Sequence, residues 1–234
     1  RWGGWYVTGT HGNQVHMGNL LAPDHVIALG MSAQTYVSQL NLSVGANIKD
    51  IRDKFDRSRY LSPHSDIAAL LVFAHQANVH NLITRTGYET RISIYEKEFP
   101  ANATDIPVDR VPPSLRNTVE ALVSAMLFSG EQPFAGPVQG SSEFAKQFSQ
   151  AGPRDHKGRS LRDFDLNRRL FRYPLSYLVY AEAFDALPEL ARNLIYRRFR
   201  EILSGSDTNP LYAHLSREDR TAILEILKDT KPGF

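Results

Sequence analysis

The longest regular pattern in the chain is a helical repeat of apolar residues that follows the segment Ser-Pro-His-Ser-Asp at 62–66. Ser62 is a favourable N-cap, Pro63 fits the first helical position, and Asp66 suits the positive end of the helix dipole. Apolar residues then recur at helical spacing from Ile67 to Leu82, and only Asn78 interrupts the pattern. We therefore expect a helix that runs to about Thr86, where Gly87 caps it or marks a kink.

Shorter helical patterns recur along the rest of the chain, separated by segments rich in Gly and Pro. The segment 99–113 carries four prolines and must be a connector. Pro188 and Gly205 mark the start and the end of one helix, and Ser216 begins a capping-box signature. The spacing predicts further helices at about 45–55, 115–126, 142–150, 174–186, 188–203 and 216–228.

These patterns predict an all-α fold with long irregular loops. Residues 1–22 lack a helical period and indicate an extended arm, and residues 23–234 form the helical body. Hydrophobic residues make up 42% of the chain and charged residues 22%, which suits one globular domain over 1–234. The chain opens at Arg1, directly before a cluster of aromatic residues. We expect Arg1 to be a cut point, so that this chain is a fragment from the C-terminal side of a longer protein.

Composition excludes several classes of function. The sequence has no cysteine, so it holds no thiolate nucleophile, no cysteine zinc site and no C-x-x-C-H haem attachment of its own. The net charge of +2 offers no footprint for nucleic acid, and no apolar run is long enough for a membrane span. The common hydrolase, nucleotide-binding and metalloprotease motifs are absent as well, which leaves any enzymatic activity undecided.

Histidines are therefore the main candidates for metal or redox chemistry. His11, His16 and Met17 lie in a glycine-rich segment of the arm. Imidazole nitrogen and thioether sulfur are the common axial donors to haem iron, and nearby glycines allow close approach to a flat ligand. The alternative is a polar loop whose histidines only bond the backbone.

A second group of histidines lies on the long predicted helix. His64 and His75 are eleven residues apart and nearly share a helical face, whereas His75 and His80 diverge by roughly 140°. A straight helix cannot direct both His75 and His80 to one metal. Either a π-bulge brings them together, or they serve different partners, or one lies in the core while the other is exposed.

Basic and acidic residues alternate between Arg154 and Arg172. Such alternation is typical of a solvated face with ion pairs, and binding of a propionate or phosphate is the less favoured interpretation.

Three stretches together resemble a family of bacterial exported, cytochrome-c-like proteins. They are Arg1–Gly12 with His16–Asn19, His75–Arg85, and Lys157–Asp165 with Phe171–Pro174. The resemblance covers most of the chain and corresponds to the C-terminal half of that family.

The resemblance implies a haem c attached by upstream sequence and a periplasmic or extracellular location. By matching positions it also implies cofactor-binding roles for four histidines, His11, His16, His75 and His80. The cofactor-binding candidates are His11, His16, Met17, His75, His80 and Arg85, and the metal-binding candidates are His75, His80, His16 and Met17.

The leading hypothesis is a redox segment for electron transfer, which packs against a c-type haem and supplies an axial donor to it. The partner would be the upstream haem-bearing part of the same protein or a separate redox protein. A rival hypothesis is a non-redox helical interaction subunit that docks through Trp2, Trp5 and Tyr6. A third is a non-haem metal enzyme built on His11, His16, His75 and a carboxylate such as Asp24.

Overall fold

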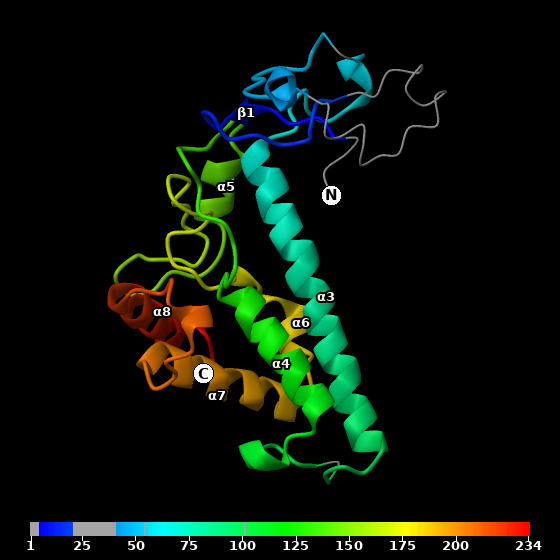
Figure 1. The fold of residues 1–234 in the computed structure, drawn as a ribbon, viewed down its shortest axis with the longest axis vertical. Coiled ribbons are helices and arrows are strands. Elements are labelled where there is room, and N and C mark those ends of the chain that lie inside the picture. Colours follow the sequence, from blue (N-terminus) through cyan, green and yellow to red (C-terminus); the bar gives the residue numbers. More distant parts are fainter. Residues whose placement is uncertain (1–4, 21–40, 54, 101) are drawn as a thin grey trace. The chain divides into compact units, whose positions relative to one another are not determined.

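The computed structural model describes residues 5–20, 41–53, 55–100 and 102–234. The protein is mainly helical with one small sheet, which confirms the predicted fold class. The helices are α3 (Ile67–Tyr95), α4 (Pro113–Met126), α5 (Phe144–Gln150), α6 (Glu182–Asp185), α7 (Glu189–Ser204) and α8 (Arg217–Thr230) (Figure 1). The 3₁₀ helices are η1 (Leu42–Gly45), η2 (Arg57–Arg59), η3 (Val108–Arg110), η4 (Tyr177–Tyr180) and η5 (Pro210–Tyr212), and the strands are β1 (Gly9–Thr10) and β2 (Gln139–Gly140).

Contacts group the chain into two compact units. Unit 1 comprises Arg1–Val72, Pro133–Phe148 and Asp165–Leu170. Unit 2 comprises Phe73–Gln132, Ser149–Phe164 and Phe171–Phe234. The prediction of one domain over the whole chain stays a prediction.

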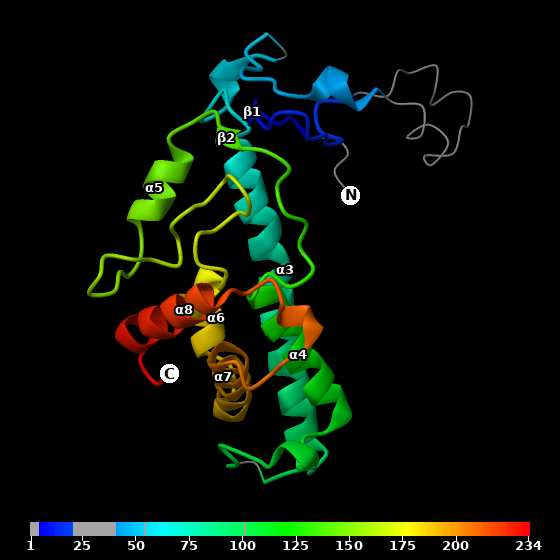
Figure 2. The ribbon, with the colours of Figure 1, turned by 60° about the vertical axis from the view of Figure 1, so that its left-hand side comes forward.

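Unit 1 is organised around the first turn of α3. β1 and β2 pair antiparallel, with Gly9 opposite Gly140, close to the start of that helix (Figure 2). One carboxylate oxygen of Asp66 accepts hydrogen bonds from the N–H groups of Ala68 and Ala69, and the other accepts from the N–H and hydroxyl of Ser142. A Cβ at Gly140 would lie 2.6 Å from both carboxylate oxygens, so only glycine fits beside this carboxylate.

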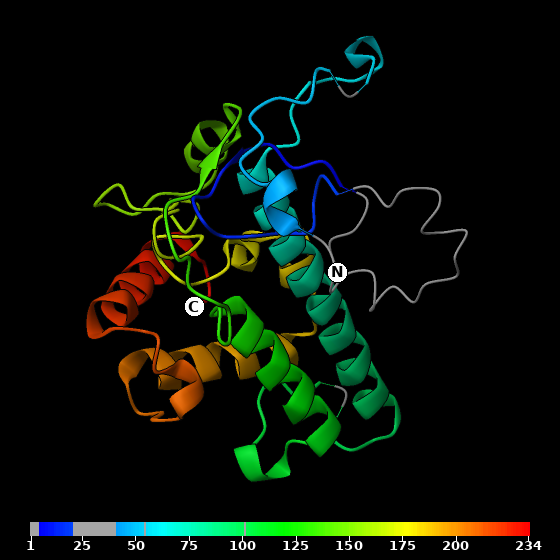
Figure 3. The same cartoon turned by 45° about the horizontal axis from the view of Figure 1, so that its top comes forward.

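Unit 2 contains a helical core. α7 packs against both α4 and α8, and Figure 3 shows these helices together. Their inward faces are fully buried and aliphatic or aromatic: Leu122, Val123 and Met126 from α4, Ile195 and Phe199 from α7, and Ile223, Ile226 and Leu227 from α8. This burial is the main stabilising contribution to unit 2.

The long helix differs from its prediction at both ends. It starts at Ile67 and is capped by Asp66, so Ser62 is not its cap. It also continues past Gly87 to Tyr95. Gly87 is buried, and a Cβ there would lie 3.4 Å from Leu187, so this residue lies in a packed helix interior and does not end the helix.

Two predicted helices are wrong. The described residues of 45–55 are irregular after η1, and residues 174–186 form η4 and α6 instead of one continuous helix. The remaining helices are confirmed with small shifts at their ends. Gly205 ends α7 with φ +84°, and Ser216 forms the expected capping box with Asp219 on α8.

Within the described residues, no helix is long and apolar enough to cross a membrane.

Candidate functional site

The sequence candidates fall into two sets. His11, His16 and Met17 belong to unit 1, and His75, His80 and Arg85 belong to unit 2. Trp2 and Asp24 lie outside the described residues.

The arm loop that carries His11 is held in place by Asn47. The side-chain oxygen of Asn47 accepts a hydrogen bond from the His11 backbone N–H at 2.7 Å, and its amide nitrogen donates to the Gly12 carbonyl at 2.8 Å. The backbone N–H of Asn47 donates to Nε2 of His11 at 3.2 Å. His11 is only 2% exposed, so these bonds fix a buried ring.

His16 and Met17 line an apolar cleft of about 360 Å³ in unit 1. Gly18 forms part of the cleft wall, and any side chain there would collide with Val7. The volume falls in the range of small-molecule and cofactor sites. The lining residues are Trp5, Val7, Val15, His16, Met17, Gly18, Ile67, Leu70 and Leu71.

Hydrogen bonds assign the neutral tautomers of the two arm histidines. Nδ1 of His16 accepts from the Gly18 N–H at 3.0 Å, so Nε2 carries the proton of the neutral ring. Nε2 of His11 accepts from Asn47, so Nδ1 carries its proton and lies buried without a hydrogen-bond partner in the described part of the chain. The two rings meet edge to face at 4.8 Å.

The environment of His16 favours the neutral imidazole. Partial burial lowers the pKa of His16, and the adjacent His11 lowers it further because two positive charges would repel. A neutral ring is the form that a metal or a hydrophobic ligand requires.

His75 is a core residue whose ring is held by one hydrogen bond and by aromatic packing. Its Nε2 lies 2.8 Å from the Ser176 hydroxyl, and its Nδ1 lies 3.7 Å from a Glu131 carboxylate oxygen. The ring stacks on Phe128 at 4.2 Å and meets the edge of Phe171 at 6.3 Å. This packing explains why a polar ring lies on the buried face of α3.

The Ser176–His75–Glu131 arrangement resembles a hydrolytic triad in its connectivity. However, Ser176 is 0% exposed, and its hydroxyl also accepts a hydrogen bond from the Leu178 N–H. A nucleophile must reach its substrate, so the observed contacts fit a structural cap of η4 better than a catalytic group.

His80 and Arg85 are exposed on α3. The predicted divergence of His75 and His80 is therefore confirmed: one ring is buried and the other is exposed. His64 precedes α3 and is not on it, so the expected helical face shared with His75 does not exist.

Across the described residues, no group of three or more histidines, cysteines, aspartates or glutamates is placed to hold a metal ion. The third hypothesis, a non-haem metal enzyme, therefore lacks a site in this part of the chain.

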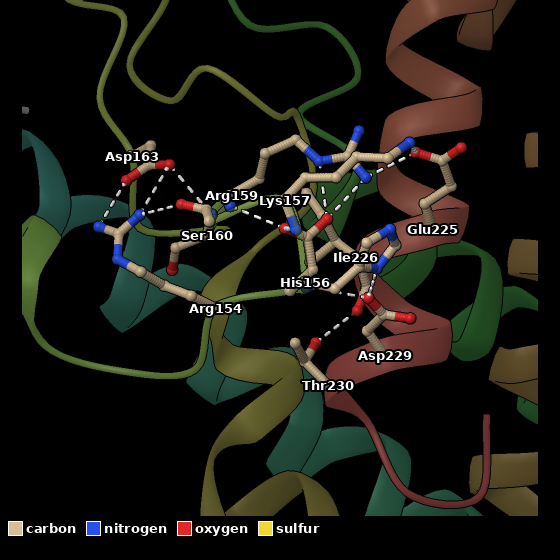
Figure 4. A network of polar contacts seen from close by, with 12 residues as sticks. Arg154, His156, Lys157, Arg159, Ser160, Asp163, Glu225, Ile226, Asp229 and Thr230 are labelled. Atoms are coloured by element: carbon tan, nitrogen blue, oxygen red, sulfur yellow. Dashed lines mark hydrogen bonds and ion pairs between the residues drawn. The ribbon is translucent and has the colours of Figure 1, made fainter.

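The charged segment after Arg154 forms ion pairs, as predicted. Arg154 pairs with Asp163 at 2.9 Å, and Arg159 bridges Asp155 and Glu225, each at 2.6 Å (Figure 4). Asp155 is buried, so this is not a fully solvated face, and the pair of Arg159 with Glu225 joins the loop to α8.

Sequence reasoning missed the residues that hold the candidate histidines in place. Asn47 and Asn19 both adopt a left-handed backbone, with φ of +55° and +63°, and their amides bond the arm. Asparagine is enriched at such positions, but a single sequence does not reveal which asparagines adopt it. Ser176 gives an equally weak signal, because its partner is 101 residues away.

No family model, characterised protein or solved structure significantly matches this chain.

Proposed function

We propose that this chain is a haem-contacting segment of a redox protein, with the haem edge in the unit 1 cleft. The supporting observation is that Met17 and His16, which carry the two side-chain donor types common in haem proteins, line the same apolar cleft. The haem would be attached outside these 234 residues, by the same protein or by a redox partner, because the chain has no cysteine.

Met17 and His16 are not equally suited to bind a haem iron. The thioether of Met17 needs no change of protonation to act as a donor. Nε2 of His16 carries a proton while Nδ1 accepts from Gly18, so ligation through Nε2 would require the loss or transfer of that proton. Met17 is therefore the favoured donor, and His16 is better suited to donate a hydrogen bond at the rim of the cleft.

The rest of the cleft would control the environment of the group. A bound haem supplies a one-electron redox couple. Trp5, Val7 and Leu70 provide apolar surface that limits water access, and a low-dielectric surrounding with a thioether donor raises a haem potential.

The candidate histidines of unit 2 have weaker support. His75 is buried and its Nε2 already bonds the Ser176 hydroxyl, and His80 is exposed on α3. We accordingly give neither residue a ligand role.

The test is a pair of cleft variants in the natively purified protein, Met17→Leu and Val15→Leu. Leucine at position 17 keeps the volume but removes the sulfur, whereas Val15→Leu changes the same cleft without changing a donor. We expect Met17→Leu alone to lower the reduction potential and to alter the ferric spectrum. Equal potentials and spectra in the wild type and both variants would exclude Met17 as a donor.

A further inference from the structure

The methionines of this chain differ in how accessible they are to reagents in solution. The sequence has three methionines, of which Met31 lies outside the described residues. Met126 is 0% exposed in the core of unit 2. Met17 is partly exposed and lines the apolar cleft of unit 1. A reagent in solution therefore reaches Met17 in the folded protein, whereas Met126 is shielded.

An accessible thioether is a target for oxidation. The chain has no cysteine, so no thiolate competes with methionine for an oxidant. Hydrogen peroxide converts an accessible methionine into methionine sulfoxide, and sulfoxide reductases restore the thioether. Met17 thus combines two properties that are seldom found together, since it is open to the reagent and also forms part of a binding surface.

The chemical step is complete with hydrogen peroxide as the oxidant. The thioether sulfur attacks one peroxide oxygen, the O–O bond breaks, and an S–O bond forms. The proton of the transferred hydroxyl passes to the departing hydroxide, which leaves as water. Sulfur is thereby oxidised by two electrons, and the peroxide is reduced by two.

Oxidation would change the character of the cleft wall. The thioether of Met17 is apolar, and so are Val7, Leu70 and Leu71, which line the same cleft. A sulfoxide places a strong hydrogen-bond acceptor in that wall. Covering this acceptor with an apolar ligand removes it from water, which costs free energy unless a donor replaces the water. The oxidised cleft should therefore bind an apolar ligand more weakly.

His16 offers the oxidised side chain a donor while the cleft is empty. It precedes Met17 in the sequence and lines the same cleft. Its Nδ1 accepts from the Gly18 N–H, so Nε2 of the neutral ring carries a proton. Among the described residues, no acceptor bonds this Nε2–H. A sulfoxide oxygen on the next residue can accept from it, and this bond would stabilise the oxidised form without a ligand.

We propose that Met17 is a reversible oxidation site, and that its sulfoxide closes the unit 1 cleft to apolar ligands. The oxidation follows from the accessibility of Met17 and from the chemistry of the thioether. The regulatory effect rests on the proposed function, because it requires the cleft to be the place where an apolar group such as a haem edge binds.

Peptide mass spectrometry tests the selectivity of the oxidation. The chain is treated with hydrogen peroxide under native conditions, and sulfoxide is quantified at each methionine after digestion. We expect Met17 to be oxidised at least about tenfold faster than Met126. The same treatment in urea is the control, because unfolding exposes both side chains. Equal rates at Met17 and Met126 in the folded chain would overturn the proposal.

Binding of anilinonaphthalene sulfonate, a fluorescent probe for apolar sites, tests the consequence. We expect peroxide to weaken binding of the probe by about fivefold or more, and methionine sulfoxide reductase with dithiothreitol to restore it. Met17→Leu should bind the probe and lose the response to peroxide. Val15→Leu is the matched control, since it changes the same cleft but keeps the sulfur and should keep the response.

Two results of the probe experiment contradict the proposal. One is absent or unchanged binding of the probe after Met17 has been oxidised, and the other is an equal response to peroxide in Met17→Leu. The visible spectrum tests the haem separately. A protein that responds to peroxide as expected but carries no haem would contradict the proposed function alone.

Discussion

At the scale of single residues, the described histidines differ in what their surroundings permit. Ring stacking on Phe128 and the Ser176 bond fix His75 inside unit 2. Burial and the neighbouring His11 lower the pKa of His16, which lines a cleft. His80 is exposed on α3. The same side-chain type thus has three different environments, and only the alternation of inside and outside on α3 was predictable from spacing.

The bond between His75 and Ser176 predicts a measurable loss of stability. Ser176→Ala removes the hydroxyl and leaves both a ring nitrogen and the Leu178 N–H buried without that partner. We expect the free energy of unfolding to fall by about 1–3 kcal/mol, measured by urea denaturation.

His80→Ala is the control for that change. The His80 ring is exposed on α3, the helix that carries His75. His80→Ala should change the free energy of unfolding by less than about 0.5 kcal/mol. Equal effects of the two substitutions would contradict the structural role of Ser176.

Asp207 predicts a pH dependence. The hydrogen bond from the Arg198 guanidinium lowers the pKa of Asp207 below its usual value of 3.8. Because the folded-state pKa is lowered, this ion pair stabilises the protein fully above about pH 4 and loses its contribution as the pH falls through the folded-state pKa.

The measurement is the difference in unfolding free energy between the wild type and Asp207→Asn. At pH 7 the variant should be less stable by about 1–2 kcal/mol, since a charge-assisted bond at 2.7 Å is weakened. The difference should shrink as the pH approaches 2. A difference that is constant over this range would show that proton binding to Asp207 is not coupled to folding.

At the scale of elements, capping signals were informative where they were local. The Ser216 box and Gly205 lie within a few residues of the groups they bond, so α7 and α8 were predicted well. The predicted start of α3 was wrong because Asp66, and not Ser62, caps the helix. The Asp66 carboxylate is held in place by a hydrogen bond from Ser142, which is 76 residues away in the sequence. The two wrong helices share this cause, since local spacing does not report the long-range contacts that select an irregular chain.

Gly87 predicts a stabilising substitution in α3. A Cβ there would approach the end of the Arg91 side chain at 2.9 Å, which is flexible, and Leu187 at 3.4 Å, which is ordinary contact. Gly87→Ala should therefore raise the free energy of unfolding by roughly 0.5–1 kcal/mol because alanine is the better helix former. Thermal unfolding followed by circular dichroism measures this, and a lower midpoint would mean that Leu187 cannot adjust.

At the scale of the molecule, the two units differ in the kind of surface they offer. The helices α4, α7 and α8 form the buried apolar core of unit 2. The cleft of unit 1 combines apolar walls with two donor side chains. Sequence reasoning found those donors but not the cleft, because residues from the arm and from α3 form it together.

The most direct test of the proposed function is a visible absorption spectrum of the natively purified protein, oxidised and then reduced with dithionite. The haem proposal predicts a Soret band that shifts on reduction, with sharp α and β bands. It also predicts that the reduced spectrum changes in Met17→Leu and not in Val15→Leu. A featureless spectrum from full-length protein purified together with its bound partners would contradict it, and a helical interaction subunit would then become the leading description of this chain.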